Sequence, residues 1–246
     1  MLGDPYTCTI TQAMSFNLPL SRLFGKRNLR LPKTSDEIGD YTTNFERAAE
    51  FTASCGFPMS KIVWHQDISL DKSGDFIEPA MRVAGVHDPS KSAAQCLKWC
   101  HYIAPAFENQ LGCKVWVTLG QIWKGDQAVF GPTWEDMKRW GQIGIQLDYF
   151  RGRMGLNLHA WLTVDTGEII DPTFLSSLAA ICGGEYAKFA GATVWGRDPH
   201  VLNNHRYFPM AIGREFVEAI GNKSVVPLLA INSAELHQFT AMLVPD

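Results

Sequence analysis

The chain has 246 residues, of which 46% are hydrophobic and 19% charged, and it contains eight tryptophans. This composition is typical of a well-packed globular protein and excludes a disordered chain. The net charge is −3 and the longest basic run, Gly25–Arg30, is short, so the sequence lacks the footprint of a nucleic-acid-binding protein. No apolar stretch approaches a membrane span, and the first residues lack the charged and apolar regions of a signal peptide. We therefore expect a cytoplasmic protein with no membrane or nucleic-acid partner, with export by a signal-independent route left open.

The length fits a single domain covering residues 1–246. Residues 1 to about 40 mix glycine, proline and polar residues without a sustained period, which predicts an extended N-terminal arm. The six cysteines are spaced irregularly, so we expect no disulfide framework.

The first predicted helix covers Thr42–Cys55, with Thr43 as N-cap and Glu46 completing a capping box. Met59–Gln66 is expected to form a short strand or helix, and Asp67–Glu78 a loop.

A second helix is predicted to begin near Ser92, with Ser90 or Ser92 as its N-cap. Pro105 is expected to kink this helix or to end its first segment. Cys96 falls in the first turn, where unpaired backbone N–H groups and the helix dipole favour a thiolate and can stabilise a substrate oxyanion. Cys100 lies one turn further in, where the dipole effect has faded. Cys96 is therefore the predicted nucleophile, and Cys100 the alternative.

The central segment predicts a strand over Lys114–Trp123, which is rich in β-forming residues, and a turn at Lys124–Asp126. Ala128–Phe130 is expected to return as a short strand. Thr133 and Asp136 form a second capping-box pattern, which predicts a helix running to about Gly141.

The stretch from Leu158 to Thr173 predicts a β-hairpin that carries a histidine on one strand and an aspartate on the other. Apolar residues alternate along Leu158–Val164, and Asp165-Thr166-Gly167 supplies a three-residue turn with glycine in the left-handed position. Such a turn pairs Val164 with Glu168, Thr163 with Ile169 and Trp161 with Asp171. His159 and Asp171 then lie on the same face on a diagonal, whereas a two-residue turn would place them on opposite faces. An imidazole oriented by a carboxylate is two thirds of a nucleophilic triad.

After the hairpin, Pro172–Cys182 is predicted to be a helix that Gly183-Gly184 ends. The tail predicts a helix near Ala211–Ile220 and strands over Val225–Ile231 and Phe239–Val244. Helices followed by an antiparallel sheet indicate an α+β fold.

The cysteine at a helix start, the His-Ala-Trp strand and the Asp-Pro-Thr strand resemble the transglutaminase-like branch of the papain-like cysteine-enzyme superfamily. The resemblance covers roughly residues 90 to 175. It implies a papain-like fold in which a helix N-terminus packs on an antiparallel sheet, with Cys96 as nucleophile, His159 as base and Asp171 as the orienting acid. The long gap between Cys96 and His159 implies an insertion around residues 124 to 154. A catalytic core over residues 84–182, followed by an extension over 183–246, is the expected organisation.

Three further residues are candidates for the site. Gln95 and Gln121 are polar side chains that could donate to an oxyanion, and Trp161 is expected to form a wall of the cleft. Most of the specificity is expected from the insertion and from the tail after Gly183. No cofactor is expected.

The expected function is a cysteine hydrolase that cleaves amide bonds of a protein or peptide through a thioester, as a protease, isopeptidase or deamidase. A transamidase or acyltransferase of the same superfamily and a non-catalytic papain-like binding module stay open as alternatives. A zinc site is a weaker competitor, because the Cys-x-x-x-Cys pair lacks a second paired motif. Its candidate ligands are Cys96, Cys100, His101, His200 and His205.

Overall fold

The computed structural model describes residues 29–151, 153, 155–197 and 204–238. The chain divides into Met1–Arg30 and a compact unit, Leu31–Asp246. Ile38 is buried in the core of the compact unit. The arm predicted for residues 1 to about 40 is therefore too long at its C-terminal end, and its residues 1–28 lie outside the described part of the chain.

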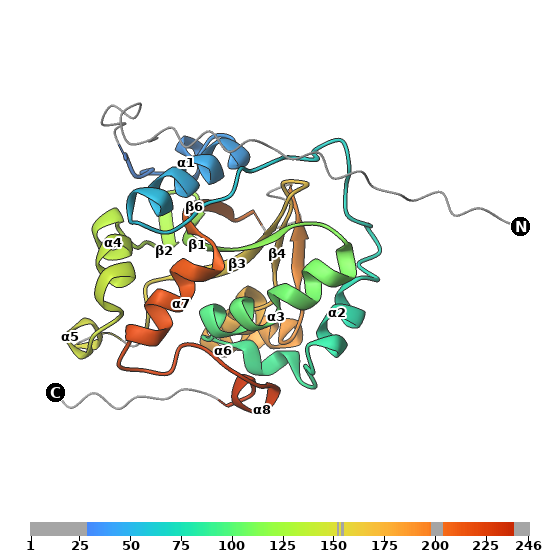
Figure 1. The fold of residues 1–246 in the computed structure, drawn as a ribbon. Coiled ribbons are helices and arrows are strands. Elements are labelled where there is room, and N and C mark those ends of the chain that lie inside the picture. The colour runs from blue at the N-terminus through green and yellow to red at the C-terminus, as the bar shows by residue number, and fades with distance from the viewer. Residues whose placement is uncertain (1–28, 152, 154, 198–203, 239–246) are drawn as a thin grey trace, which may run out of the picture. The chain divides into compact units, whose positions relative to one another are not determined.

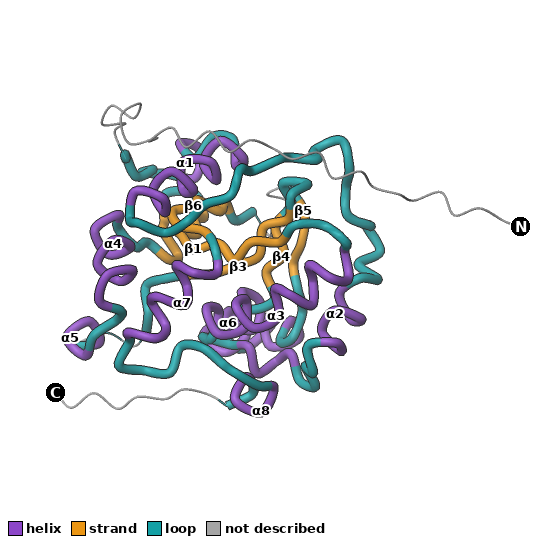
Figure 2. Tube along the Cα trace, in the orientation of Figure 1, coloured by secondary structure: helices purple, strands orange, loops and turns teal. Residues whose placement is uncertain are grey.

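The compact unit is built on a six-stranded sheet in which every described pairing is antiparallel (Figures 1 and 2). The strands run in the order β2-β1-β3-β4-β5, and β6 also pairs with β1. Their bounds are β1 (Val115–Lys124), β2 (Gln127–Phe130), β3 (His159–Val164), β4 (Ile169–Asp171), β5 (Val194–Gly196) and β6 (Arg206–Ile212). The α+β class with an antiparallel sheet is therefore confirmed.

The long central strand β1 has β6 along one edge and β3 followed by β2 along the other. Thr118 pairs with Trp161 of β3 and with Ile212 of β6, so β3 and β6 lie on opposite edges. Ile122 pairs with Phe130 of β2 and also with β6, so β2 and β3 share one edge. This arrangement brings the end of β2 next to the start of β3, where His159 lies.

The hairpin β3–β4 has the predicted register. Thr163 pairs with Ile169, and the backbone N–H of Val164 donates to the carbonyl of Glu168 over 2.9 Å. Gly167 has the left-handed φ of +86° that the three-residue turn requires. The structure therefore contains the three-residue turn that places His159 and Asp171 on the same face.

The helices and 3-10 turns pack around this sheet, with α1 on one side and α3 and α7 on the other (Figure 1). Helix α1 places Phe45 and Ala48 against Trp116 and Ile212 of the sheet. No helix in the described ranges is long and apolar enough to cross a membrane. The bounds are α1 (Tyr41–Ser54), α2 (Ile77–Val83), α3 (Cys96–Leu111), α4 (Trp134–Ile143), α5 (Leu147–Phe150), α6 (Phe174–Cys182), α7 (Arg214–Lys223) and α8 (Ser233–Leu236), with 3-10 turns η2 (Ser35–Glu37), η3 (Pro89–Ser92) and η4 (Gly184–Phe189).

Two predicted helix starts are wrong in detail. Helix α1 is capped by Asp40, which accepts from the backbone N–H of Thr43, and Glu46 accepts from the Trp64 indole instead of closing a capping box. Helix α3 begins only at Cys96, after Gln95, and Ser92 lies in the separate turn η3. The capping box of Thr133 and Asp136, in contrast, is present at the start of α4.

Other differences come from long-range pairing. The predicted helix over Ala211–Ile220 starts at Arg214, because Ala211 belongs to β6. Met59–Gln66 and Val225–Ile231 form no regular element, although the backbone N–H of His65 donates to the turn of the hairpin at Asp165.

Helix α2 begins at the end of the predicted loop Asp67–Glu78 and was not predicted. Pro105 does not end α3, which continues to Leu111. The predicted strand Phe239–Val244 lies outside the described residues.

The predicted catalytic core over 84–182 and the predicted extension over 183–246 share one sheet. Strand β6 pairs with the central strand β1 along Thr118–Trp123, so the predicted extension supplies an integral strand of the sheet. Helix α1, which precedes the predicted core, packs on β1 and β6.

Candidate active site

The hairpin brings His159 and Asp171 into direct contact. His159 Nε2 lies 2.6 Å from Asp171 Oδ2, and the two side chains are 1% and 0% exposed. The diagonal relation predicted from the turn is therefore what joins them. Gly120 of β1 pairs with His159, and a Cβ at that glycine would lie 2.1 Å from the carbonyl oxygen of Phe208. Only glycine allows the three strands to approach this closely at the histidine.

Both oxygens of Asp171 are saturated with hydrogen bonds. Oδ1 accepts from the backbone N–H groups of Thr173 and Phe174, each over 3.0 Å, and from the Thr173 hydroxyl over 3.2 Å. Oδ2 accepts from the Tyr207 hydroxyl over 2.9 Å in addition to His159. Burial opposes ionisation, but the charge and hydrogen bond of His159, with the other donors, lower the pKa of Asp171 below its ordinary value. The carboxylate is fixed and charged.

Cys96 is the first residue of α3 and is partly exposed. Its Sγ lies 3.6 Å from the carbonyl oxygen of Leu158, the residue before His159. The backbone reaches this position through Ala94, which has a left-handed φ of 56° and whose N–H donates to Ser177 Oγ over 3.0 Å. A non-glycine residue held in this conformation next to the site is local strain that its surroundings maintain.

The pKa of His159 depends on both Asp171 and Cys96. Burial lowers the pKa of His159, but the negative charges of Asp171 and Cys96 and the hydrogen bonds from both outweigh this and raise it to about 10. Asp171 occupies Nε2, so Nδ1 is the ring nitrogen left for the thiol. The imidazole ring stacks against the rings of Phe130 and Trp161, with ring centroids 4.9 Å and 6.2 Å apart.

Cys100 is not brought to the imidazole. Its side chain is fully buried and its thiol donates to the carbonyl of Ala160 over 3.3 Å. Burial, together with the charges of Asp171 and Cys96, raises the pKa of Cys100 well above its ordinary value. The alternative nucleophile is therefore a protonated core thiol.

Of the three auxiliary candidates, Gln95 lines the cavity beside Cys96, whereas Gln121 and Trp161 do not. Gln95 Nε2 donates to the carbonyl of Lys91, and Gln121 Nε2 donates to that of Pro132. Trp161 is fully buried, and its indole N–H donates to Tyr41 Oη over 2.7 Å. The Trp161 ring stacks against the His159 ring, and Trp161 is not among the residues that line the cavity.

Tyr207 is a site residue that the sequence did not indicate. It lies on β6, is 3% exposed, and its hydroxyl donates to Asp171. Burial and the charge of Asp171 raise the pKa of Tyr207 well above its ordinary value, so the hydroxyl stays a donor. The sequence predicted no element at Tyr207, because the helix predicted over Ala211–Ile220 begins after it, so no local signal placed this hydroxyl near the hairpin.

A cavity of about 720 Å³ opens onto Cys96 and His159. It is lined by Val129 and Phe130, by the loop between α5 and β3, by α6 and by the segment 226–228. Residues of the predicted insertion and of the tail after Gly183, from which most of the specificity is expected, therefore line this cavity.

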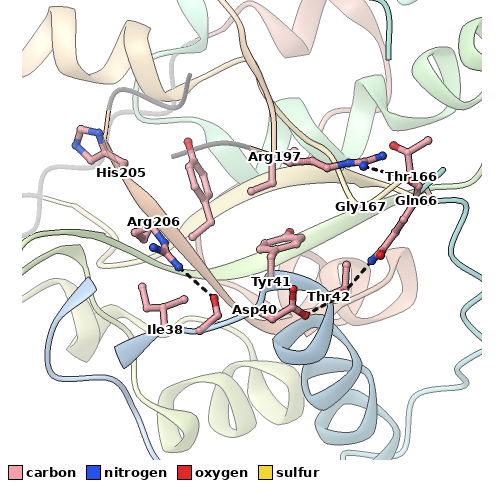
Figure 3. Close-up of a pocket in the computed structure, with 13 residues that line it drawn as sticks. Ile38, Asp40, Tyr41, Thr42, Gln66, Thr166, Gly167, Arg197, His205 and Arg206 are labelled. Carbon is pink, nitrogen blue, oxygen red and sulfur yellow. Dashed lines mark hydrogen bonds between the residues drawn. The ribbon is translucent and has the colours of Figure 1, made fainter. Parts of the chain in front are cut away.

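A second cavity of about 340 Å³ lies at the start of α1 and carries more polar side chains (Figure 3). In this cavity the Arg206 guanidinium donates to the carbonyl of Gly39, and the Gln66 amide donates to the Thr42 hydroxyl. Tyr207 lines this cavity while its hydroxyl reaches Asp171. The polar groups here largely satisfy one another.

A zinc site gains no support from the described residues, among which no three His, Cys, Asp or Glu side chains are grouped to hold a metal ion. His101 instead contacts Glu218 over 3.1 Å, and His200 lies outside the described part.

No protein-family model, no curated protein and no solved structure matches the chain.

Proposed function

We propose that the protein is a cysteine hydrolase of papain-like, transglutaminase-like architecture that cleaves amide bonds of a protein or peptide. The observation that carries this proposal is the contact of His159 with Asp171 over 2.6 Å beside a thiol at a helix start. A buried carboxylate that fixes an imidazole, and an imidazole that activates a nucleophile, are the parts of a nucleophilic triad. The open cavity at Cys96 gives a substrate access to the thiol.

The first half of the reaction forms a thioester. Cys96 Sγ attacks the amide carbon as a thiolate while His159 holds the proton as an imidazolium. The oxyanion faces the first backbone N–H groups of α3, which have no partner within the helix. The C–N bond then breaks, and His159 gives its proton to the leaving amine.

The second half regenerates the enzyme. His159, now neutral, takes a proton from a water molecule, whose oxygen attacks the thioester carbon. The C–S bond breaks, the acid product leaves and the thiolate–imidazolium pair is restored. Asp171 keeps its charge throughout and fixes the ring. A primary amine in place of water would give transamidation by the same steps.

The decisive experiment is intact mass spectrometry after brief treatment with iodoacetamide at about pH 6.5, where an ordinary free thiol is mostly protonated. We expect one fast adduct that Cys96→Ala abolishes and Cys100→Ala leaves in place. His159→Ala should slow the labelling of Cys96, because the thiolate loses its counter-ion.

The same four proteins should be incubated with a mixture of unmodified peptides, and new termini counted by mass spectrometry. Cleavage by the wild type and Cys100→Ala, with none by Cys96→Ala, is the expected result. Slow labelling of Cys96 in the wild type, unchanged by His159→Ala, would show that the scaffold is a binding module and would overturn the proposal.

A further inference from the structure

We infer that the cavity at Cys96 selects peptides in which a bulky apolar residue and an acidic residue both lie within a few positions of the scissile amide. This inference rests on the proposed function and adds the class of substrate. It follows from what lines the cavity and from what is exposed at its rim.

The walls of the cavity are mainly apolar side chains from three separate segments. They include Phe130, Leu156, Val226 and Leu228. Helix α6 adds Ile181, whose side chain is 75% exposed at the rim. An exposed isoleucine is not unusual by itself, but this one borders the cavity at the proposed nucleophile, where a substrate can cover it. An apolar substrate side chain would bury this surface.

The size of the cavity suits a short peptide segment. Its volume of about 720 Å³ falls in the range that encloses ligands of drug size. A single glutamine side chain would leave most of this space empty, so the cavity favours a main-chain amide with neighbouring residues over deamidation of one side chain.

Apart from the Cys96–His159 pair, the charges that line the cavity are of one sign. Lys98 and Arg153 are the other charged side chains among its described lining residues, and no carboxylate is among them. The chain as a whole has a net charge of −3, so a positive cavity does not reflect the overall composition. Clefts of one sign concentrate ligands of the opposite sign.

Arg153 supplies the charge that a substrate can reach. Lys98 is buried and its ammonium donates to Gln95 and to the carbonyl of Gln238. The guanidinium of Arg153 lies 4.3 Å from the centre of the Tyr149 ring and is exposed. It forms no salt bridge with any of the described residues. It therefore favours an acidic group and repels lysine or arginine.

The experiment uses the full chain and a degenerate peptide library, with cleavage positions read by mass spectrometry. For the wild type we expect Leu, Ile, Met or Phe to be enriched beside the cleaved bond, Asp or Glu nearby, and Lys and Arg to be depleted. A cleaved set with no enrichment of apolar residues, or with basic residues enriched, would overturn the inference.

Two pairs of variants test the two parts separately. Arg153→Glu should shift the ratio of acidic to basic peptides cleaved at least about fivefold toward basic ones, whereas Arg151→Glu, a neighbouring exposed arginine that does not line the cavity, should not. Ile181→Asp should lower kcat/KM for the apolar peptides about tenfold. Ile231→Asp, at a position that is 85% exposed and away from the cavity, should leave it unchanged.

Labelling of Cys96 with iodoacetamide distinguishes the two possible failures. If the wild type cleaves peptides but either pair of variants behaves alike, the substrate class is wrong and the hydrolase stands. If no peptide is cleaved although Cys96 reacts fast in a His159-dependent way, amide hydrolysis itself is wrong, and the substrate class falls with it.

Discussion

The two halves of the candidate site are built in opposite ways. On the hairpin, His159 and Asp171 are almost completely buried, and each oxygen of the carboxylate has several donors. At the start of α3, Cys96 is partly exposed on a cavity, and its thiol lies 3.6 Å from the carbonyl oxygen of Leu158. The acid–base half is fixed, whereas the nucleophile half is open.

This difference suits the acyl transfer that we propose. A general base must keep its orientation through both halves of the reaction, so its supporting hydrogen bonds belong in the core. The nucleophile must meet an incoming carbonyl carbon, so it cannot be covered. Cys100 shows the alternative, because one turn further along the same helix the thiol is buried, protonated and out of reach.

The largest expected effect comes from removing the charge of the fixed half. Asp171→Asn should reduce turnover by about 10⁴-fold with the fold retained, because the imidazole loses its orienting anion. The matched control is Asp165→Asn in the turn of the same hairpin, which should retain turnover within a few-fold. Kinetics and circular dichroism of the two variants measure this, and near-normal turnover in Asp171→Asn would mean that the hairpin pair is only structural.

The second prediction concerns the protonation of His159. Its pKa is raised from an ordinary value of 6.5 to about 10, so the ring is charged at neutral pH. A group whose pKa is raised on folding stabilises the folded protein fully below its unfolded pKa and loses this contribution as pH rises through the folded value. Stability toward urea should therefore fall between about pH 6.5 and about pH 10.

Nitrogen-15 NMR of labelled histidines measures the charge directly. His159 should still be an imidazolium at pH 8, whereas His101, whose pKa is lowered by burial, should be neutral and serves as the internal reference. Cys96→Ala removes one of the charges that raise the pKa of His159, so its titration should move to lower pH. A wild-type ring that is neutral at pH 8 would contradict a stable thiolate–imidazolium pair.

A smaller effect is expected from Tyr207→Phe, which removes one donor from Asp171. The hydroxyl helps to lower the pKa of Asp171, so its loss should raise that pKa and move the acid limb of the activity profile to higher pH. We expect kcat at neutral pH to fall about tenfold, equivalent to one hydrogen bond to a charged group. The measurement is kcat as a function of pH.

The control for Tyr207 is Tyr41→Phe, because the Tyr41 hydroxyl contacts Thr163 and Trp161 and does not reach the carboxylate. It should lower stability and leave the shape of the pH profile unchanged. Identical profiles for the two variants would show that Tyr207 has only a structural role.

The sequence predicted the fixed half better than the open half, and the reason is the range of the interactions. The hairpin is local: alternation along Leu158–Val164 and a glycine in the turn determine its register, and the register determines which side chains meet. The prediction that Cys96 lies in a first helical turn is confirmed, but the predicted N-cap, Ser90 or Ser92, is wrong, because the helix begins after Gln95.

That cap depends on residues distant in the chain. Ser92 donates to the carbonyl of Pro172, and Ala94 is held in its left-handed conformation by Ser177 of α6. Strand β6 escaped prediction for a similar reason, because Pro209 disfavours a strand and is tolerated here at the irregular pairing opposite Gly120. Tyr207 could therefore not be placed beside Asp171 from local pattern.

The smallest expected effect tests the turn on which the fixed half depends. Gly167 has a φ of +86°, and a β-branched side chain there would be strained and would approach the Thr42 methyl group. Gly167→Val should cost about 1–2 kcal/mol of stability.

Gly112→Val is the matched control. This glycine also has a positive φ, of +64°, but has open space around it and lies at the opposite end of α3 from Cys96. Both variants should unfold at lower urea concentration, but only Gly167→Val should also reduce kcat, because its strain is relieved by displacing β4 and with it Asp171. An equal loss of stability with kcat preserved in both would show that the hairpin holds its register without this turn, and that the contact of Asp171 with His159 is maintained instead by the donors from Thr173, Phe174 and Tyr207.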